Sequence, residues 1–160
     1  MIIKELRDED FTNYKLPSMV VGFPSCTFKC EKECGCKGMC QNSELVNSPD
    51  IKISDEDIVA RYKASPISQA LVIGGLEPFD DYHQLLDLML EFRSQVADPI
   101  IIYTGYYKDE IQPVLYKYIV EHIPNVIIKW GRFIPNQKPH YDPVLGIQLA
   151  SDNQYAEKIS

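Results

Sequence analysis

The sequence lacks long apolar runs and lacks an excess of basic residues. No stretch of its 160 residues approaches the about 18–20 consecutive apolar residues of a membrane-spanning helix, so we expect no membrane association. Lys and Arg number 16 against 23 Asp and Glu, which gives a formal charge of −7. This sign argues against binding the phosphates of nucleic acid as a main task. The acidic N-terminus lacks the apolar segment of a signal peptide, which predicts a cytoplasmic location.

Cysteine is absent from most of the chain and is concentrated in one segment, residues 26–40, which holds Cys26, Cys30, Cys34, Cys36 and Cys40. An odd number of thiols in a reducing compartment argues against a disulfide framework. Thiolates are soft ligands that suit zinc or iron–sulfur clusters, so the segment predicts a metal centre. Three thiolates would leave one iron of a cluster free for a small molecule, whereas four would close the site.

The rest of the chain predicts one α/β domain over residues 1–160. Short apolar runs predict buried strands at 19–23, 69–74, 99–104 and 125–130. Helices are expected at 55–64, 81–95 and 108–122, with Pro113 in the first turn or at a kink. Residues 132–160 carry little signal beyond an apolar run at 145–149.

This alternation indicates a parallel sheet covered by helices, built as a partial (βα) barrel or as an open doubly wound sheet. A complete eight-fold barrel takes about 250 residues and is excluded by length.

Three loops are expected to meet at one end of this sheet, because ligands bind at the C-terminal ends of parallel strands. Cys26 follows the first of the predicted strands, residues 74–78 follow the second, and residues 103–106 close the third. In the second loop, Gly74 and Gly75 allow a ligand to approach the backbone closely. Glu77 supplies a carboxylate that can accept hydrogen bonds from an ammonium group.

These motifs together resemble a known family. Residues 23–30 (Phe-Pro-Ser-Cys-Thr-Phe-Lys-Cys), followed by Cys-Gln-Asn at 40–42, are similar to the cluster loop of radical S-adenosylmethionine enzymes. More narrowly, the chain resembles the activating protein of the anaerobic ribonucleotide reductase. Further matches lie at residues 102–106, 131–133 and 151–154, so the resemblance covers about residues 19–155.

The resemblance implies a partial barrel and a set of binding residues. Cys26, Cys30 and Cys40 would bind three irons of a [4Fe–4S] cluster, and the fourth iron would bind the amino and carboxylate groups of S-adenosylmethionine. The amino group would be held by the turn that contains Gly74, Gly75 and Glu77, and the cofactor site would be lined by Tyr103 and Thr104, with Tyr106 as a further candidate.

The resemblance also implies a reaction. Reductive cleavage of S-adenosylmethionine would give a 5′-deoxyadenosyl radical, and no catalytic side chain beyond the cluster is expected. The implied partners are a large glycyl-radical protein, such as the anaerobic ribonucleotide reductase, and an electron donor such as flavodoxin or ferredoxin.

Two departures from the family pattern leave alternatives open. Nine residues separate Cys30 from Cys40, so Cys34 and Cys36 are alternative third ligands. Leu76 is inserted into the Gly-Gly-Glu-Pro motif. A zinc module is a second hypothesis, because Cys30 and Cys34, and Cys36 and Cys40, have the spacing of paired zinc ligands. A closed cluster for electron transfer is a third.

Overall fold

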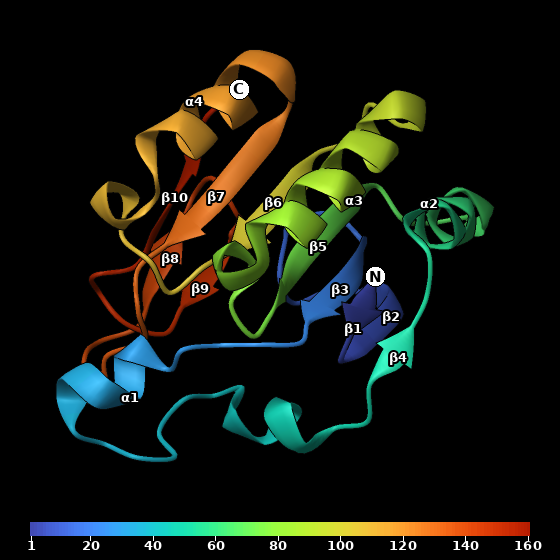
Figure 1. Cartoon of the computed structure of the whole chain (residues 1–160). Helices are drawn as coiled ribbons and strands as arrows, with labels where there is room; N and C mark the ends of the chain where they lie inside the picture. Colours follow the sequence, from blue (N-terminus) through green and yellow to red (C-terminus); the bar gives the residue numbers. More distant parts are fainter.

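The computed structural model describes all 160 residues, and its centre is a six-stranded mixed sheet (Figure 1). The strands follow the spatial order β10 (Tyr155–Lys158), β7 (Val126–Trp130), β6 (Ile100–Tyr103), β5 (Ala70–Gly75), β3 (Ser18–Phe23) and β2 (Glu5–Asp10). The inner four strands are parallel, and β2 and β10 pair antiparallel at the two edges. The fold is therefore α/β with a mixed, open sheet, and its description as a partial barrel stays a prediction.

Three helices cover one face of the sheet: α2 (Asp55–Ala64), α3 (Tyr82–Gln95) and α4 (Pro113–His122). Helix α2 begins where the sequence predicts, because the side chain of Ser54 accepts a hydrogen bond from the backbone of Asp57. The predicted helix at 108–122 is divided into a 3-10 turn, η3 (Lys108–Glu110), and α4. Pro113 starts α4, since it has no backbone N–H to give to a preceding turn.

The helix-covered face holds the larger core. It includes Phe23, Ile73 and Trp130 from the strands and Leu85 and Phe92 from α3, and all five side chains are fully buried. Burial of such side chains stabilises the fold by about 1.5–3 kcal/mol each.

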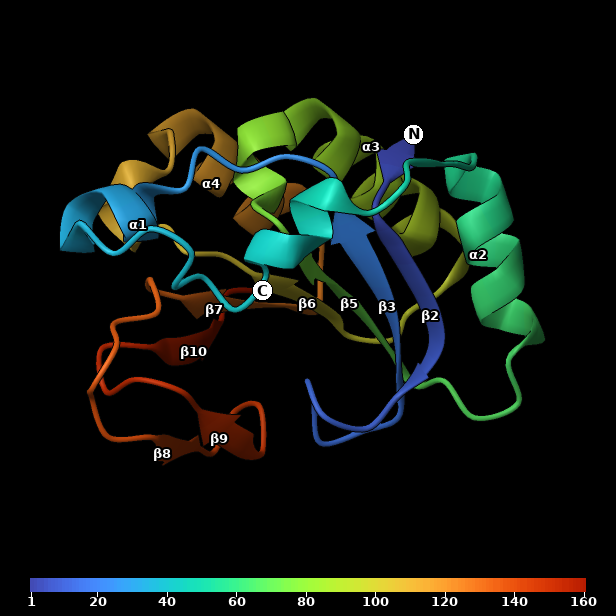
Figure 2. The same cartoon turned by 90° about the horizontal axis from the view of Figure 1, so that it is seen from below.

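The opposite face of the sheet is covered by a hairpin rather than by helices (Figure 2). Strands β8 (His140–Asp142) and β9 (Ile147–Leu149) form a two-stranded sheet, and Leu145 and Leu149 pack against Val72 and Ile127. The expectation of helices on the whole sheet is therefore wrong for this face. The reason is that the C-terminal segment, which carries little periodicity, folds back across it.

The remaining elements are short: β1 (Ile2–Ile3) paired with β4 (Ile51–Lys52), α1 (Lys29–Cys34), and the 3-10 turns η1 (Ser43–Asn47) and η2 (Pro78–Asp81). None of the helices combines the length and the apolar character that a bilayer crossing requires.

Candidate functional site

The cysteine segment leaves the end of β3 and is tied to the neighbouring strand. Beyond β3, the backbone N–H of Glu77 donates to the carbonyl of Ser25 at 2.8 Å. Within the sheet, Gly75 pairs with Phe23 and has φ +79°, a conformation that glycine adopts without strain. These contacts hold Cys26 beside the turn that ends β5.

Three of the five thiols line one cavity of about 440 Å³ at this end of the sheet, namely those of Cys26, Cys30 and Cys40. The Cys26 sulfur accepts a hydrogen bond from the backbone of Phe28 at 3.2 Å. Cys30 and Cys40 also border a small neighbouring hollow together. Cys34 and Cys36 do not line this cavity.

Burial raises the pKa of the two inner thiols. The pKa of Cys26 is raised to about 12, chiefly by desolvation. The pKa of Cys30 is raised to about 11 by desolvation and then by the neighbouring Cys40. Both groups are therefore protonated at neutral pH without a metal, and a metal centre would displace these protons on binding.

The donor set fits an iron–sulfur cluster. A cubane bonds each thiolate to a different iron, so it needs thiols that share a cavity rather than thiols that converge on one point. The trio of Cys26, Cys30 and Cys40 meets that requirement.

The short helix α1, which carries Cys30, is anchored by an ion-pair network that we call the clasp: Glu33, Glu110 and Arg132. The guanidinium of Arg132, whose side chain is 3% exposed, donates to both carboxylate oxygens of Glu110 at 2.7 and 2.5 Å. Its Nε lies 3.1 Å from the carboxylate of Glu33 in α1. The clasp thereby links α1 to the segment after β7.

Cys40 is positioned by contacts from both of its sides. Its backbone N–H donates to the carboxylate of Glu31 at 3.2 Å. Two residues later, the side-chain amide of Asn42 donates to the carbonyl of Gly75 at 2.6 Å. The chain around Cys40 is thus fastened both to α1 and to the glycine turn.

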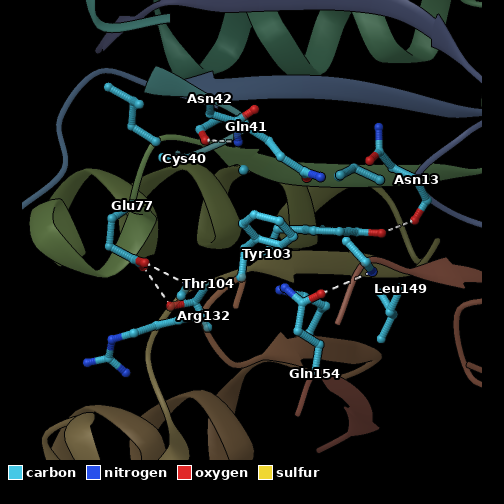
Figure 3. Close-up of a pocket in the computed structure, with 18 of the residues that line it drawn as sticks. Asn13, Cys40, Gln41, Asn42, Glu77, Tyr103, Thr104, Arg132, Leu149 and Gln154 are labelled. Atoms are coloured by element: carbon cyan, nitrogen blue, oxygen red, sulfur yellow. Dashed lines mark hydrogen bonds between the residues drawn. The ribbon is translucent and has the colours of Figure 1, made fainter. Parts of the chain in front are cut away.

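Glu77 lines the cavity, is 4% exposed, and lies beside Thr104 (Figure 3). One carboxylate oxygen accepts from the hydroxyl of Thr104 at 2.7 Å and from the backbone of Phe79 at 3.2 Å, and the other accepts from the backbone of Gly105 at 2.8 Å. Desolvation raises the pKa of Glu77 to about 7, although these hydrogen bonds oppose the shift. The inserted Leu76 is buried, lines the cavity and leaves Glu77 facing it.

Of the predicted cofactor residues, Gly74, Gly75, Glu77, Tyr103 and Thr104 all line the cavity. The hydroxyl of Tyr103 donates to the carbonyl of Asn13 at 2.5 Å (Figure 3). Tyr106 does not line the cavity. Its hydroxyl contacts Asp80, and the ammonium of Lys29 lies 4.0 Å from its ring.

Sequence reasoning gave no role to Lys129, a charged residue of the site. It is the only charged residue of β7, lines the cavity at 7% exposure, and donates to the carbonyl of Gly131 at 2.8 Å. Desolvation lowers its pKa to about 8, opposed by the charge of Glu77. The available signal was a lysine within an otherwise apolar run. Periodicity alone does not say which way one polar residue of such a run points.

Comparison with known families supports the iron–sulfur prediction. A family model described as a 4Fe-4S single cluster domain matches residues 18–154, a range that contains all five cysteines and every predicted site residue. A search of curated proteins and a search of solved structures returned no match. The chain therefore belongs to the 4Fe-4S single cluster domain family, and a [4Fe–4S] cluster is its cofactor.

Proposed function

We propose that this protein binds S-adenosylmethionine in the cavity beside its cluster and cleaves it reductively. The observation that carries the proposal is that three thiols, a buried carboxylate and a buried lysine line a single cavity at the C-terminal ends of the parallel strands. Open α/β sheets bind their ligands at this position.

The charges of the cavity complement an amino acid. Glu77 and Lys129 are both at least nine-tenths buried, and they carry opposite charges when ionised. Burial of an ionisable group is costly unless a partner compensates it. An ammonium group beside Glu77 and a carboxylate beside Lys129 would supply those partners, and the methionine moiety of S-adenosylmethionine carries both.

The cavity also has the size and the walls for the nucleoside. Its volume of about 440 Å³ lies within the about 300–1,000 Å³ typical of small-molecule sites. Its walls include the ring of Tyr103 and the apolar side chains of Val20, Val72 and Leu149. Such surfaces suit the adenosine part of the ligand.

Cys26, Cys30 and Cys40 would hold the cluster, which when reduced would supply the electron that breaks the carbon–sulfur bond of the sulfonium, giving methionine and a 5′-deoxyadenosyl radical. The chain contributes position and shelter. Glu77 and Lys129 would orient the methionine end, and strand β9 of the hairpin forms part of the cavity wall. The radical would then take a hydrogen atom from a glycine of a large partner protein, giving 5′-deoxyadenosine and a glycyl radical, and flavodoxin or ferredoxin would supply the electron. The sheet has two free edges and does not enclose the site as a complete barrel would.

The test is anaerobic reconstitution with iron and sulfide, followed by reduction and assay of 5′-deoxyadenosine. We expect cleavage by the unaltered chain. In Glu77→Gln we expect a loss of at least about tenfold, with the iron content unchanged. Glu121→Gln is the matched control, because Glu121 is exposed on α4 and away from the cavity. A brown protein that never cleaves S-adenosylmethionine would favour electron transfer, and a colourless zinc protein would favour the zinc module.

A further inference from the structure

The insert between Cys30 and Cys40 holds two thiols that the proposed function does not use. Cys34 ends α1 and is exposed, and Cys36 is partly exposed. Neither lines the main cavity. Of the five thiols of residues 26–40, the three that line the cavity are assigned to the cluster, which leaves this pair without a role.

The backbone turns sharply between the two thiols. Gly35, the only residue between them, has φ +65° and closes α1 by donating its N–H to the carbonyl of Glu31. After this turn, the Cys36 thiol donates to the carbonyl of Cys34 at 3.1 Å. No atom lies within 4 Å of the position that a Gly35 Cβ atom would take, so this side of the turn faces open space.

The two thiols are neighbours on this turn: that of Cys34 donates to the carbonyl of Glu31 at 3.7 Å, and that of Cys36 donates to the carbonyl of Cys34. The pKa of the Cys36 thiol is raised, first by its hydrogen bond with the Cys34 thiol. Residues separated by one position lie at most about 7 Å apart between Cα atoms. Disulfides span about 4.4–6.8 Å between Cα atoms, so neighbours of this spacing come within the reach of a disulfide when the chain turns between them.

We propose that Cys34 and Cys36 form a second thiol site, a dithiol that closes reversibly to an intramolecular disulfide by exchange with a low-molecular-weight disulfide. One thiolate attacks that disulfide and releases one small thiol, leaving a mixed disulfide on the chain. The second thiolate displaces the other small thiol and forms the bond between Cys34 and Cys36. The protein pair loses two electrons and two protons, and the small disulfide is reduced to two thiols.

The alternative to a free dithiol is that Cys34 is a ligand of the cluster. Cys34 borders a small hollow together with Cys30 and Cys40, on the side of Met39 and Phe133. The experiment must therefore separate a free dithiol from a ligand, and it must do so in the cluster-loaded chain.

The sequence offers a clean readout. Trypsin cleaves after Lys32 and Lys37, and the resulting peptide 33–37 contains Cys34 and Cys36 but no residue of the cluster trio. The loaded chain is equilibrated without oxygen in buffers of increasing ratio of glutathione disulfide to glutathione, quenched with acid, alkylated and digested. Bound iron is measured in the same samples.

We expect peptide 33–37 to become lighter by two hydrogen atoms and resistant to alkylation as the ratio rises, with iron per chain unchanged. Dithiothreitol should reverse the change. In Cys34→Ser and in Cys36→Ser, the remaining thiol should carry only a glutathione adduct. The mapping of the unaltered chain needs no variant, so a folding defect cannot obscure it.

Two results would overturn the proposal. One is a peptide that stays fully alkylated, or carries separate glutathione adducts on its two cysteines, at every ratio. The other is a double Cys34→Ser/Cys36→Ser variant that loses as much iron as Cys40→Ser does, since that would make the pair cluster ligands. No readout involves S-adenosylmethionine, so failure of the proposed cleavage would leave this test unaffected.

Discussion

The burial of Lys129 in the cavity lowers the stability of the folded chain. Its ammonium is 7% exposed, and its one hydrogen bond goes to a neutral carbonyl. Its pKa falls from 10.5 to about 8, so the folded state holds this proton less tightly than the unfolded state does. The folding penalty is complete below pH 8 and disappears as the pH rises from 8 to 10.5.

We expect Lys129→Met to stabilise the cluster-loaded chain against urea by about 2 kcal/mol at pH 7, because removal of a desolvated cation outweighs one lost hydrogen bond. The unaltered chain should gain stability as the pH rises above 8, and the variant should lack this slope. Lys117→Met is the control, because the Lys117 side chain is 73% exposed. The same Lys129 variant should bind S-adenosylmethionine more weakly. A variant that is less stable at pH 7 would contradict the assignment.

Individual site residues could be predicted where the residue type alone indicates the chemistry. Thiols and glycines stand out in a sequence, and the predicted Cys26, Cys30, Cys40, Gly75 and Glu77 do line one cavity. Lys129 and the clasp were not predictable in this way. Their roles depend on which side chains a strand turns inward and which loops meet, and both are properties of the folded chain.

Among the elements, α1 depends most on contacts outside itself. It has six residues, no buried side chain, and a left-handed non-glycine residue, Phe28, before its first turn. A helix this short is not stable alone in water. The clasp through Arg132 therefore has to supply the anchoring that the helix lacks.

Glu110→Gln tests the clasp. Removing this carboxylate takes the bidentate partner from the buried Arg132 and the ion pair from Lys29 of α1, which should loosen α1 by about 1 kcal/mol. Iron should then be released to a chelator about fivefold faster, and amide exchange over residues 29–34 should rise. Glu33→Gln should have a smaller effect, because the Glu33 side chain is 59% exposed. Equal release from both variants and the unaltered chain would refute the anchoring role.

Strands β3 and β5 approach each other closely at Gly22 and Gly75, and this approach can be tested by substitution. A Cβ atom at Gly75 would lie 2.6 Å from the Cα atom of Gly22, whereas one at Gly35 would meet nothing within 4 Å. Both glycines have positive φ. Gly35→Ala should therefore cost about 1 kcal/mol of unfolding free energy, and Gly75→Ala about 3 kcal/mol or more, since its neighbour is backbone. Urea unfolding of the two variants measures this difference, and similar costs would contradict the close approach.

For the whole molecule, the sequence predicted the inner strands and the helices better than the edges. Strands β3, β5, β6 and β7 are apolar and fall within one or two residues of their predicted positions. Strand β2 reads Glu-Leu-Arg-Asp-Glu-Asp. Charged side chains protect an edge strand from pairing with another chain, and the same charges hide the strand from a search for apolar runs. The hairpin β8–β9 was missed because its strands are three residues long.

The assembled fold places three thiols, rather than four, around one cavity. From this we propose that the [4Fe–4S] cluster keeps one iron open to S-adenosylmethionine. Mössbauer spectroscopy of the chain reconstituted with enriched iron, before and after addition of S-adenosylmethionine, tests this claim most directly. We expect one iron of the [4Fe–4S] cluster to change its spectrum while the other three do not. A spectrum in which all irons are equivalent and unaffected by S-adenosylmethionine would contradict it.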